Sequence, residues 1–188
     1  MNKRLYIALL HNPVYNKDYE VITTSITNLD VHDICRAART YGVKRYFLVH
    51  PLQTQRQLVE EIMRYWLAGY GGESNPDRKE ALKVLELVPD LEEAQKRIME
   101  LEGQTALTVV TDARVYANSV SYREMRERIS RGDVPYLVLF GTGWGLVKEE
   151  IEKADFILHP IEADSDYNHL SVRSAVAIIL DRLLGSWQ

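Results

Sequence analysis

Continuous apolar runs alternate along this chain with stretches in which apolar residues recur every three to four positions. The continuous runs predict buried strands, and the periodic stretches predict amphipathic helices. The predicted strands cover 5–10, 44–50, 82–88, 105–111, 136–140 and 156–158. The predicted helices cover 30–41, 53–68, 90–101, 121–130, 148–153 and 169–184, with a short helix or turn from Asp77. Strands this continuously apolar leave no face for water, so we expect an α/β fold whose mostly parallel sheet has helices on both faces.

Local signals refine the ends of several elements. Gly42 follows the helix over 30–41 and is a suitable C′ residue, and Asp90 is a suitable N-cap for the helix that follows it. Asp166 or Asn168 is predicted to cap the last helix. The glycine-rich stretch 69–76 is expected to be a flexible loop.

Length and composition favour one domain. The chain has 188 residues, 46% of them apolar and 27% charged, so residues 1–188 are expected to fold as a single unit. No apolar run approaches the roughly 20 residues of a membrane-spanning helix. The amino terminus lacks a small-residue cleavage site, so we expect a cytoplasmic protein. Cys35 is the single cysteine, which excludes an internal disulfide and favours a small hydrophobic role in the core.

Charge is distributed unevenly along the chain. The net charge of −4 argues against a strongly basic nucleic-acid-binding protein, yet residues 1–56 carry eight Lys or Arg and only four Asp or Glu. A second basic cluster lies on the helix over 121–130 and just beyond it: Arg123, Arg126, Arg128 and Arg131. Such clusters are commonly a solvated helix face, and the alternative is a local phosphate-contacting surface.

Two polar loops follow two predicted strands near the carboxyl terminus. The strand over 136–140 leads into a glycine-rich turn over 141–146, and the strand over 156–158 leads into the polar run 162–171. Ligands of open α/β sheets bind beyond the carboxyl ends of the strands, so this region is the predicted site. The turn has neither the G-x-G-x-x-G spacing of a dinucleotide site nor the Lys-Ser/Thr of a P-loop. A purely structural turn is the alternative.

The run 162–171 contains two closely spaced aspartates, Asp164 and Asp166, after Glu162. They are suited to act as a general base, and acidic residues in this position are also common turn and capping residues. His169 is as suited to packing or capping as to catalysis. No combination of His, Asp and Glu has metal-binding spacing, so no metal site is expected.

Three segments together resemble the motifs of the SPOUT-class RNA methyltransferases. The first is Leu29-Asp-Val-His-Asp-Ile-Cys-Arg-Ala-Ala-Arg-Thr-Tyr-Gly-Val-Lys-Arg-Tyr-Phe-Leu-Val-His-Pro51, in which an arginine-bearing helix precedes a strand ending in proline. The second is Leu139-Phe-Gly-Thr-Gly-Trp-Gly-Leu-Val-Lys-Glu-Glu-Ile-Glu-Lys-Ala-Asp-Phe-Ile-Leu-His-Pro-Ile161, and the third is Asn168-His-Leu-Ser-Val-Arg-Ser-Ala-Val-Ala-Ile-Ile179. Any one motif alone is a weak signal, whereas three in order over most of the chain are specific.

The resemblance implies a carboxyl-terminal trefoil knot that holds S-adenosylmethionine, and a homodimer that builds its RNA site across the interface. The cofactor-binding residues that it implies are Thr111, Asp112, Phe140, Gly141, Thr142, Gly143, Gly145, Leu146, Leu158, Pro160, Ile161, Leu170 and Ser171. Arg36 matches the motif arginine that assists catalysis or holds phosphate. RNA is expected to contact Arg36, Arg39, Lys44 and Arg45.

Departures from the motifs bear on the expected reaction. Many ribose 2′-O-methylating members carry a glutamate in a longer glycine turn, where this chain has Thr142 and Gly143 and one residue fewer. The third motif commonly has asparagine where Ser171 stands, and the first has Asn and Gly where Asp30 and His32 stand. The pattern is closer to proteins similar to tRNA guanine-N1 methyltransferases, in which an aspartate takes the base proton.

Methylation of a tRNA base is therefore the expected activity, with Asp164 or Asp166 as the general base. The alternatives are a ribose 2′-O-methyltransferase of the same class, a non-catalytic RNA- or nucleotide-binding protein with the same fold, and a flavodoxin-like nucleotide-binding domain.

Overall fold

One parallel sheet organises the chain in the computed structural model, which describes residues 3–186. Its seven strands lie in the order β5-β4-β1-β8-β6-β9-β7, and every pair is parallel. The strands are β1 (Leu5–Leu10), β4 (Tyr46–Val49), β5 (Leu85–Val88), β6 (Leu107–Val110), β7 (Ser119–Val120), β8 (Tyr136–Gly141) and β9 (Phe156–Leu158). The predicted parallel α/β sheet is thus confirmed.

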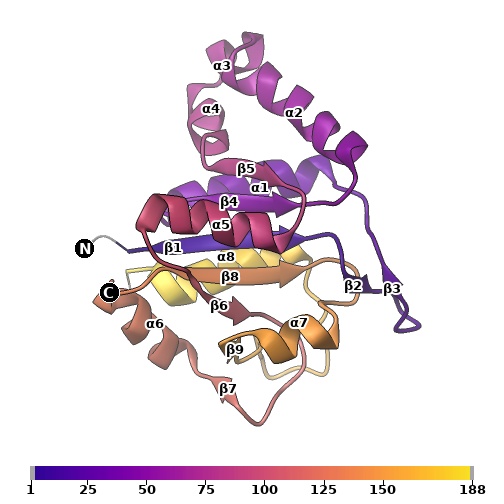
Figure 1. The fold of residues 1–188 in the computed structure, drawn as a ribbon, viewed down its shortest axis with the longest axis vertical. Helices are drawn as coiled ribbons and strands as arrows, with labels where there is room; N and C mark the ends of the chain where they lie inside the picture. Colours follow the sequence, from indigo (N-terminus) through magenta and orange to yellow (C-terminus); the bar gives the residue numbers. More distant parts are fainter. Residues whose placement is uncertain (1–2, 187–188) are drawn as a thin grey trace.

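Helices cover both faces of the sheet, as predicted (Figure 1). The helices are α1 (Asn28–Thr40), α2 (Gln53–Leu67), α3 (Tyr70–Ser74), α4 (Pro76–Leu82), α5 (Leu91–Glu102), α6 (Tyr122–Arg131), α7 (Lys148–Lys153) and α8 (Val172–Leu184). Side chains of α1, α4, α6 and α8 pack on one face, and those of α5 and α7 pack on the other. None of the helices within residues 3–186 has both the length and the apolar character needed to cross a membrane.

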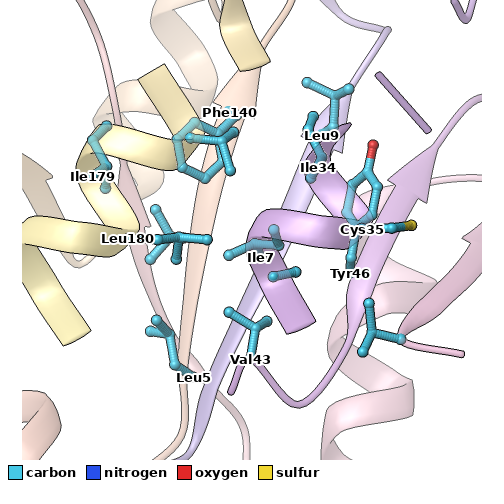
Figure 2. Close-up of a cluster of buried hydrophobic side chains, with 14 of the residues drawn as sticks. Leu5, Ile7, Leu9, Ile34, Cys35, Val43, Tyr46, Phe140, Ile179 and Leu180 are labelled. Carbon is cyan, nitrogen blue, oxygen red and sulfur yellow. The ribbon is translucent and has the colours of Figure 1, made fainter. Parts of the chain in front are cut away.

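The strands supply both cores because successive side chains point to opposite faces. On β1, Leu5, Ile7 and Leu9 join the core under α1 and α8, whereas Tyr6 and Leu10 join the core under α5 and α7. Figure 2 shows the first of these cores, where side chains of α1 and α8 gather over the central strands. Cys35 lies in it fully buried, and burial raises the pKa of its thiol, as suits a small hydrophobic residue.

Several predicted element ends are also confirmed. Gly42 has a φ of 72° directly after the α1 C-cap, and the Asp90 side chain caps α5 by accepting from the Glu93 N–H at 2.8 Å. The sequence analysis did not predict one short antiparallel hairpin. It consists of β2 (Val14–Tyr15) and β3 (Val21–Ile22), which stand outside the main sheet. Two-residue strands within a polar segment give no periodic signal.

The prediction of a flexible loop over 69–76 is wrong, because this stretch contains α3 and the start of α4. Gly71 and Gly72 are buried where α3 turns back on α2. A Cβ at Gly72 would collide with the carbonyl oxygen of Trp66. Glycine here therefore permits close packing of two helices, and the sequence alone does not distinguish this use from flexibility.

The predicted cap of the last helix is also wrong. Ser171, and not Asp166 or Asn168, is the N-cap of α8, and its hydroxyl accepts from the Ser174 N–H at 3.3 Å. The helix accordingly begins at Val172 instead of His169. Asn168 and His169 contact two other loops, which keeps the segment before Ser171 out of the helix.

Candidate functional site

Three loops meet beyond the carboxyl ends of β8, β6 and β9, which are neighbours in the sheet. The Asn168 side-chain amide donates to the Ala113 carbonyl at 3.4 Å, which joins the loop after β9 to the loop after β6. The Trp144 and His169 rings lie 5.7 Å apart, which joins the loop after β9 to the glycine turn after β8. The structure therefore brings together the three segments that sequence analysis placed around the cofactor.

The glycine turn is held by the β2 strand. Tyr15 donates its N–H to the Gly145 carbonyl at 3.0 Å, and its carbonyl accepts from the Trp144 N–H at 2.9 Å. Gly143 and Gly145 have φ angles of 59° and 97°, in the region that favours glycine. A Cβ at Gly143 would stand 2.7 Å from the Tyr15 carbonyl oxygen, so the turn and the hairpin fit only without a side chain there.

Thr142 turns its hydroxyl into the protein. The hydroxyl donates to the Leu10 carbonyl at 3.2 Å and lies within hydrogen-bond distance of the Thr24 hydroxyl, which in turn pairs with His11 Nδ1 at 3.0 Å. This placement gives Thr142 a structural part in the turn, and its main chain is paired as well: its N–H donates to the Leu10 carbonyl at 3.2 Å and its carbonyl accepts from the Gly145 N–H at 3.1 Å. The chain of hydrogen bonds fixes the turn to the ends of β1 and β3.

His11 is the last member of this series of hydrogen bonds, and its side chain is neutral. It is fully buried, and burial, with a smaller contribution from neighbouring His50, lowers its pKa to about 4. A proton on Nδ1 lets His11 donate to Thr24, Thr24 donate to Thr142 and Thr142 donate to the Leu10 carbonyl. We assign this tautomer because the buried Nε2 has no partner, and an unpaired acceptor there costs less than an unpaired N–H.

Asp112, in the loop after β6, faces the glycine turn. A Cβ at Gly145 would lie 3.8 Å from its Oδ2. The Asp112 side chain is only 5% exposed, and it accepts from Arg114 at 2.7 Å and from the Tyr116 hydroxyl at 3.3 Å. The hydrogen bond to Asp112 raises the pKa of Arg114 above its ordinary value. Thr111, just before it, donates its hydroxyl to the Leu139 carbonyl at 2.8 Å.

The remaining predicted cofactor residues divide by exposure. Four have buried side chains and can offer a ligand mainly their backbone: Phe140, Leu146, Leu158 and Pro160. Gly141 and Ile161 are half-buried, and Leu170 and Ser171 are exposed. Asp164 and Asp166 are exposed on a segment that is exposed from 162 to 171. Among residues 3–186 no three His, Cys, Asp or Glu side chains form a group suited to a metal ion.

The cations predicted to contact RNA fall into two pairs, one on α1 and one just before β4. Arg36 is exposed on α1. Arg39 pairs with Glu80 at 2.9 Å, and Arg45 lies 3.7 Å from Glu86. Lys44 and Arg45 precede β4, and the Lys44 N–H donates to the Leu5 carbonyl at the start of β1. These two residues therefore lie at the amino ends of the strands, and the three loops lie at the opposite, carboxyl ends.

The second basic cluster has largely internal partners. Arg126 donates to carbonyls at the end of α8, those of Arg182 and Gly185. Arg128 pairs with Glu124 at 2.8 Å and lies over the Phe156 ring. Arg123 and Arg131 are exposed. Half of the cluster thus serves packing of α6, which leaves little of a shared phosphate-contacting surface.

Sequence analysis missed the residues that support the loops from outside the motifs. Tyr15, His11 and Thr24 come from the segment between the strand predicted over 5–10 and the helix predicted over 30–41, and Arg114 and Tyr116 follow β6. One signal was available, namely Arg114 two residues after Asp112, a spacing that lets the carboxylate also accept from the Arg114 N–H at 2.8 Å.

A comparison with known protein families finds a match over nearly the whole chain. The profile of a family described as SAM-dependent RNA methyltransferase matches residues 4–185. The chain belongs to the SAM-dependent RNA methyltransferase family. The predicted family, enzyme class and cofactor, S-adenosylmethionine, are thus confirmed.

Relatives differ in length. A protein of Aquifex aeolicus (strain VF5) is 43% identical over 183 residues, which are 97% of this chain and 89% of that protein. A protein of Nitratidesulfovibrio vulgaris named tRNA (guanine-N(1)-)-methyltransferase is 44% identical over 185 residues, 97% of this chain but 42% of that protein. The chain therefore spans about two fifths of that relative, and the name describes the longer protein.

Solved structures show the same fold at low identity. A TrmH/SpoU tRNA-modifying enzyme of A. aeolicus superposes with a TM-score of 0.57 at 17% identity, over 97% of this chain and 74% of that one.

The loops of this methyltransferase fit the cofactor in chemistry. Gly143 and Gly145 keep side chains off the turn, so a nucleoside can approach its main chain closely. The Trp144 N–H and the Gly145 carbonyl are already paired with Tyr15, so they support the turn instead of binding the ligand. Asp112 faces the same turn from the loop after β6, and Leu170 and Ser171 are exposed at the end of the loop after β9.

Proposed function

We propose that this protein transfers the methyl group of S-adenosylmethionine to a base of tRNA, with guanine N1 as the first candidate. The observation that carries the proposal is the meeting of the 111–118, 141–147 and 159–171 loops, within a family of RNA methyltransferases. The base and the RNA are proposed from the relative's printed name and from the sequence departures at Thr142, Gly143 and Ser171.

The proposed reaction requires no covalent bond between the protein and the substrate. S-adenosylmethionine, when bound, would supply an electrophilic methyl group by breaking its methyl–sulfur bond and would leave as the neutral thioether S-adenosylhomocysteine. The glycine turn and the Asp112 loop hold the donor, and the acceptor must lie in line with it, so positioning accounts for much of the rate. As the N1–methyl bond forms, the N1–H proton leaves, and the carboxylate of Asp164 or Asp166 accepts it. Both lie in the third loop and are exposed to solvent.

Arg36 is proposed to hold the substrate RNA or to support its reacting group. It is exposed on α1, the helix that α8 packs against. Arg173 at the start of α8 contacts Asp33 of α1 at 3.0 Å, so the helix bearing Arg36 is tied to the helix that follows the third loop. Arg39, Lys44 and Arg45 are proposed as further RNA contacts on this protein's surface.

The proposal includes three architectural statements. Residues 1–188 form one SPOUT-like domain, the carboxyl-terminal segment passes through a trefoil knot, and two copies assemble as a dimer that acts on RNA in the cytoplasm. The placement of β6 between β8 and β9 and the resemblance to the A. aeolicus enzyme support the fold statements. Light scattering after size exclusion tests the dimer.

Nucleoside mass spectrometry tests the activity. Unmodified tRNA is incubated with the protein and isotopically labelled S-adenosylmethionine, digested, and analysed against standards. We expect labelled 1-methylguanosine. A label on a 2′-O-methyl nucleoside would replace the base assignment by ribose methylation, and cofactor binding without label in any RNA would favour a non-catalytic binding protein.

A further inference from the structure

A cavity of about 660 Å³ lies next to the candidate cofactor loops, on the side of the β2–β3 hairpin and α7. Its walls include the rings of Tyr15 and Tyr19 from the hairpin and of Tyr116 from the loop after β6. Phe156 and Ile157 of β9 add apolar surface. The volume is within the range of small-molecule sites, and none of these three tyrosines is used in the chemistry proposed above.

The charged groups around the cavity are already compensated. Arg114 pairs with Asp112 at 2.7 Å, and Lys148 pairs with Glu152 at 3.3 Å. Asp155 accepts from the Thr108 N–H and hydroxyl at 2.7 and 2.9 Å. A phosphate would have to displace an existing ion pair, whereas an uncharged aromatic ring would not. The cavity therefore favours a planar, polar ring over an anion.

The aromatic walls are fixed before any ligand arrives. The Tyr15 hydroxyl accepts from the Lys148 N–H at 3.2 Å, and the Tyr116 hydroxyl donates to Asp112 at 3.3 Å. Tyr15 and Tyr19 meet edge to face with ring centroids 5.7 Å apart. Walls that are already ordered lose little conformational entropy on binding, which favours stacking of a ring between them.

Tyr19 is the unusual member of this group. Its φ is 59°, a conformation that is rare for a large side chain, and its side chain is 64% exposed. The Asn16 side-chain oxygen accepts from the N–H groups of Asp18 and Glu20, both at 2.9 Å, and so holds the turn around Tyr19. The hairpin thus keeps an apolar ring at the mouth of the cavity, where packing in the core does not require it.

We propose that this cavity binds one unpaired base of the RNA substrate, stacked against Tyr19 and Tyr116. Stacking suits a base because every base has a flat aromatic face, and the Asn118 amide at the cavity wall can pair with its polar edge. The proposal rests on the proposed action on RNA. Tyr15 lines the cavity and also pairs with the glycine turn, and Tyr116 lines it and donates to Asp112 of the cofactor loops, so the bound base is held next to the methyl donor.

Fluorescence anisotropy with a labelled single-stranded RNA, at one fixed salt concentration, tests the proposal. Tyr19→Ala is expected to weaken RNA binding about tenfold, as loss of one base stack does. Tyr19→Phe keeps the ring and is expected to bind as the wild type does. Tyr70→Ala is the matched control, because Tyr70 is a similarly exposed tyrosine on α3, far from the cavity in the sequence and absent from its lining.

The nucleobase in this cavity could come from the RNA or from the adenine of the cofactor. Calorimetry with S-adenosylmethionine on the same variants distinguishes these two sources. We expect Tyr19→Ala to leave cofactor affinity unchanged. Equal RNA affinity of Tyr19→Ala and wild type would overturn the cavity assignment, and so would a loss of cofactor affinity, which would make this the adenine site. If the wild type neither binds nor methylates RNA, the proposed function itself fails.

Discussion

Arg114 and Asp112 form a two-point ion pair in which Nε lies 3.0 Å from Oδ1 and Nη2 lies 2.7 Å from Oδ2. The carboxylate is 5% exposed, whereas the guanidinium is 44% exposed. The pair therefore compensates a nearly buried charge at the centre of the three loops, and its cation also forms part of the adjoining cavity.

Arg114→Ala is expected to destabilise the fold by about 2 kcal/mol, since it leaves the Asp112 carboxylate with fewer partners. Urea unfolding followed by circular dichroism measures this change. Arg123→Ala, which removes an exposed arginine of α6, is the control and is expected to change stability by less than about 0.5 kcal/mol. Equal stability of the two variants would mean that solvent, and not Arg114, satisfies Asp112.

Gly143→Ala is expected to cost about 3 kcal/mol and to weaken cofactor binding. The substitution combines a left-handed backbone at φ 59° with a Cβ 2.7 Å from the Tyr15 carbonyl oxygen, so the turn must move away from the hairpin.

The variant Gly103→Ala separates the cost of the left-handed backbone from the cost of the steric clash. Gly103 has a φ of 71° but no atom within 4 Å of the added Cβ, so only the backbone cost of about 1 kcal/mol remains. Thermal unfolding and calorimetry with S-adenosylmethionine measure both variants. Cofactor affinity that survives Gly143→Ala would show that the turn is not part of the site.

Stability is expected to fall as the pH is lowered from about 6.5 toward 4. The pKa of His11 is about 4 in the folded protein and near 6.5 in the unfolded chain, so between these values the unfolded chain binds the extra proton. Protonation of His11 lowers the free energy of unfolding by at most about 3 kcal/mol, and the decrease levels off below the pKa of the folded state.

His11→Asn should flatten this pH dependence, because its amide can replace the Nδ1–H donor without titrating. Part of the slope should remain, because burial lowers the pKa of His50 and His32 as well. His169→Gln, at an exposed position, is the control. Urea unfolding at several pH values gives the slopes, and an unchanged slope in His11→Asn would show that His11 does not titrate in this window.

Arg36→Ala is expected to slow RNA methylation about tenfold or more while leaving cofactor affinity intact, as for removal of a positioned cation. The reason is its place on the exposed face of α1, on an element other than the three cofactor loops. Single-turnover methylation and calorimetry measure the two quantities, with Arg123→Ala as the matched control. A large loss of cofactor binding in Arg36→Ala would mean that this arginine lies in the cofactor site.

Much of the architecture was predictable because buried parallel strands have a strong sequence signal. Residues 5–10 and 136–140 are almost wholly apolar, and they became adjacent central strands. Motif order then indicated which loops would meet. Strand order was not predictable from periodicity, because it depends on contacts between residues such as Leu5 and Tyr136 that are far apart in the chain.

The errors in the prediction came from residues with more than one physical use. Gly71 and Gly72 permit close helix packing, although glycines in sequence equally indicate a flexible loop. Asp166 and Asn168 are good capping residues, yet contacts of His169 with Trp144 and of Asn168 with Ala113 displaced the cap to Ser171. The support of the glycine turn by Tyr15 could not be predicted for a different reason, since it joins segments about 130 residues apart.

Isothermal titration calorimetry with S-adenosylmethionine tests the central claim most directly, because the account assigns the three loops to that ligand. The wild-type protein should bind it with one site per chain, and Gly143→Ala should bind it more weakly, whereas Gly103→Ala should bind it as the wild type does. Absence of binding by the wild type at millimolar ligand would contradict the account.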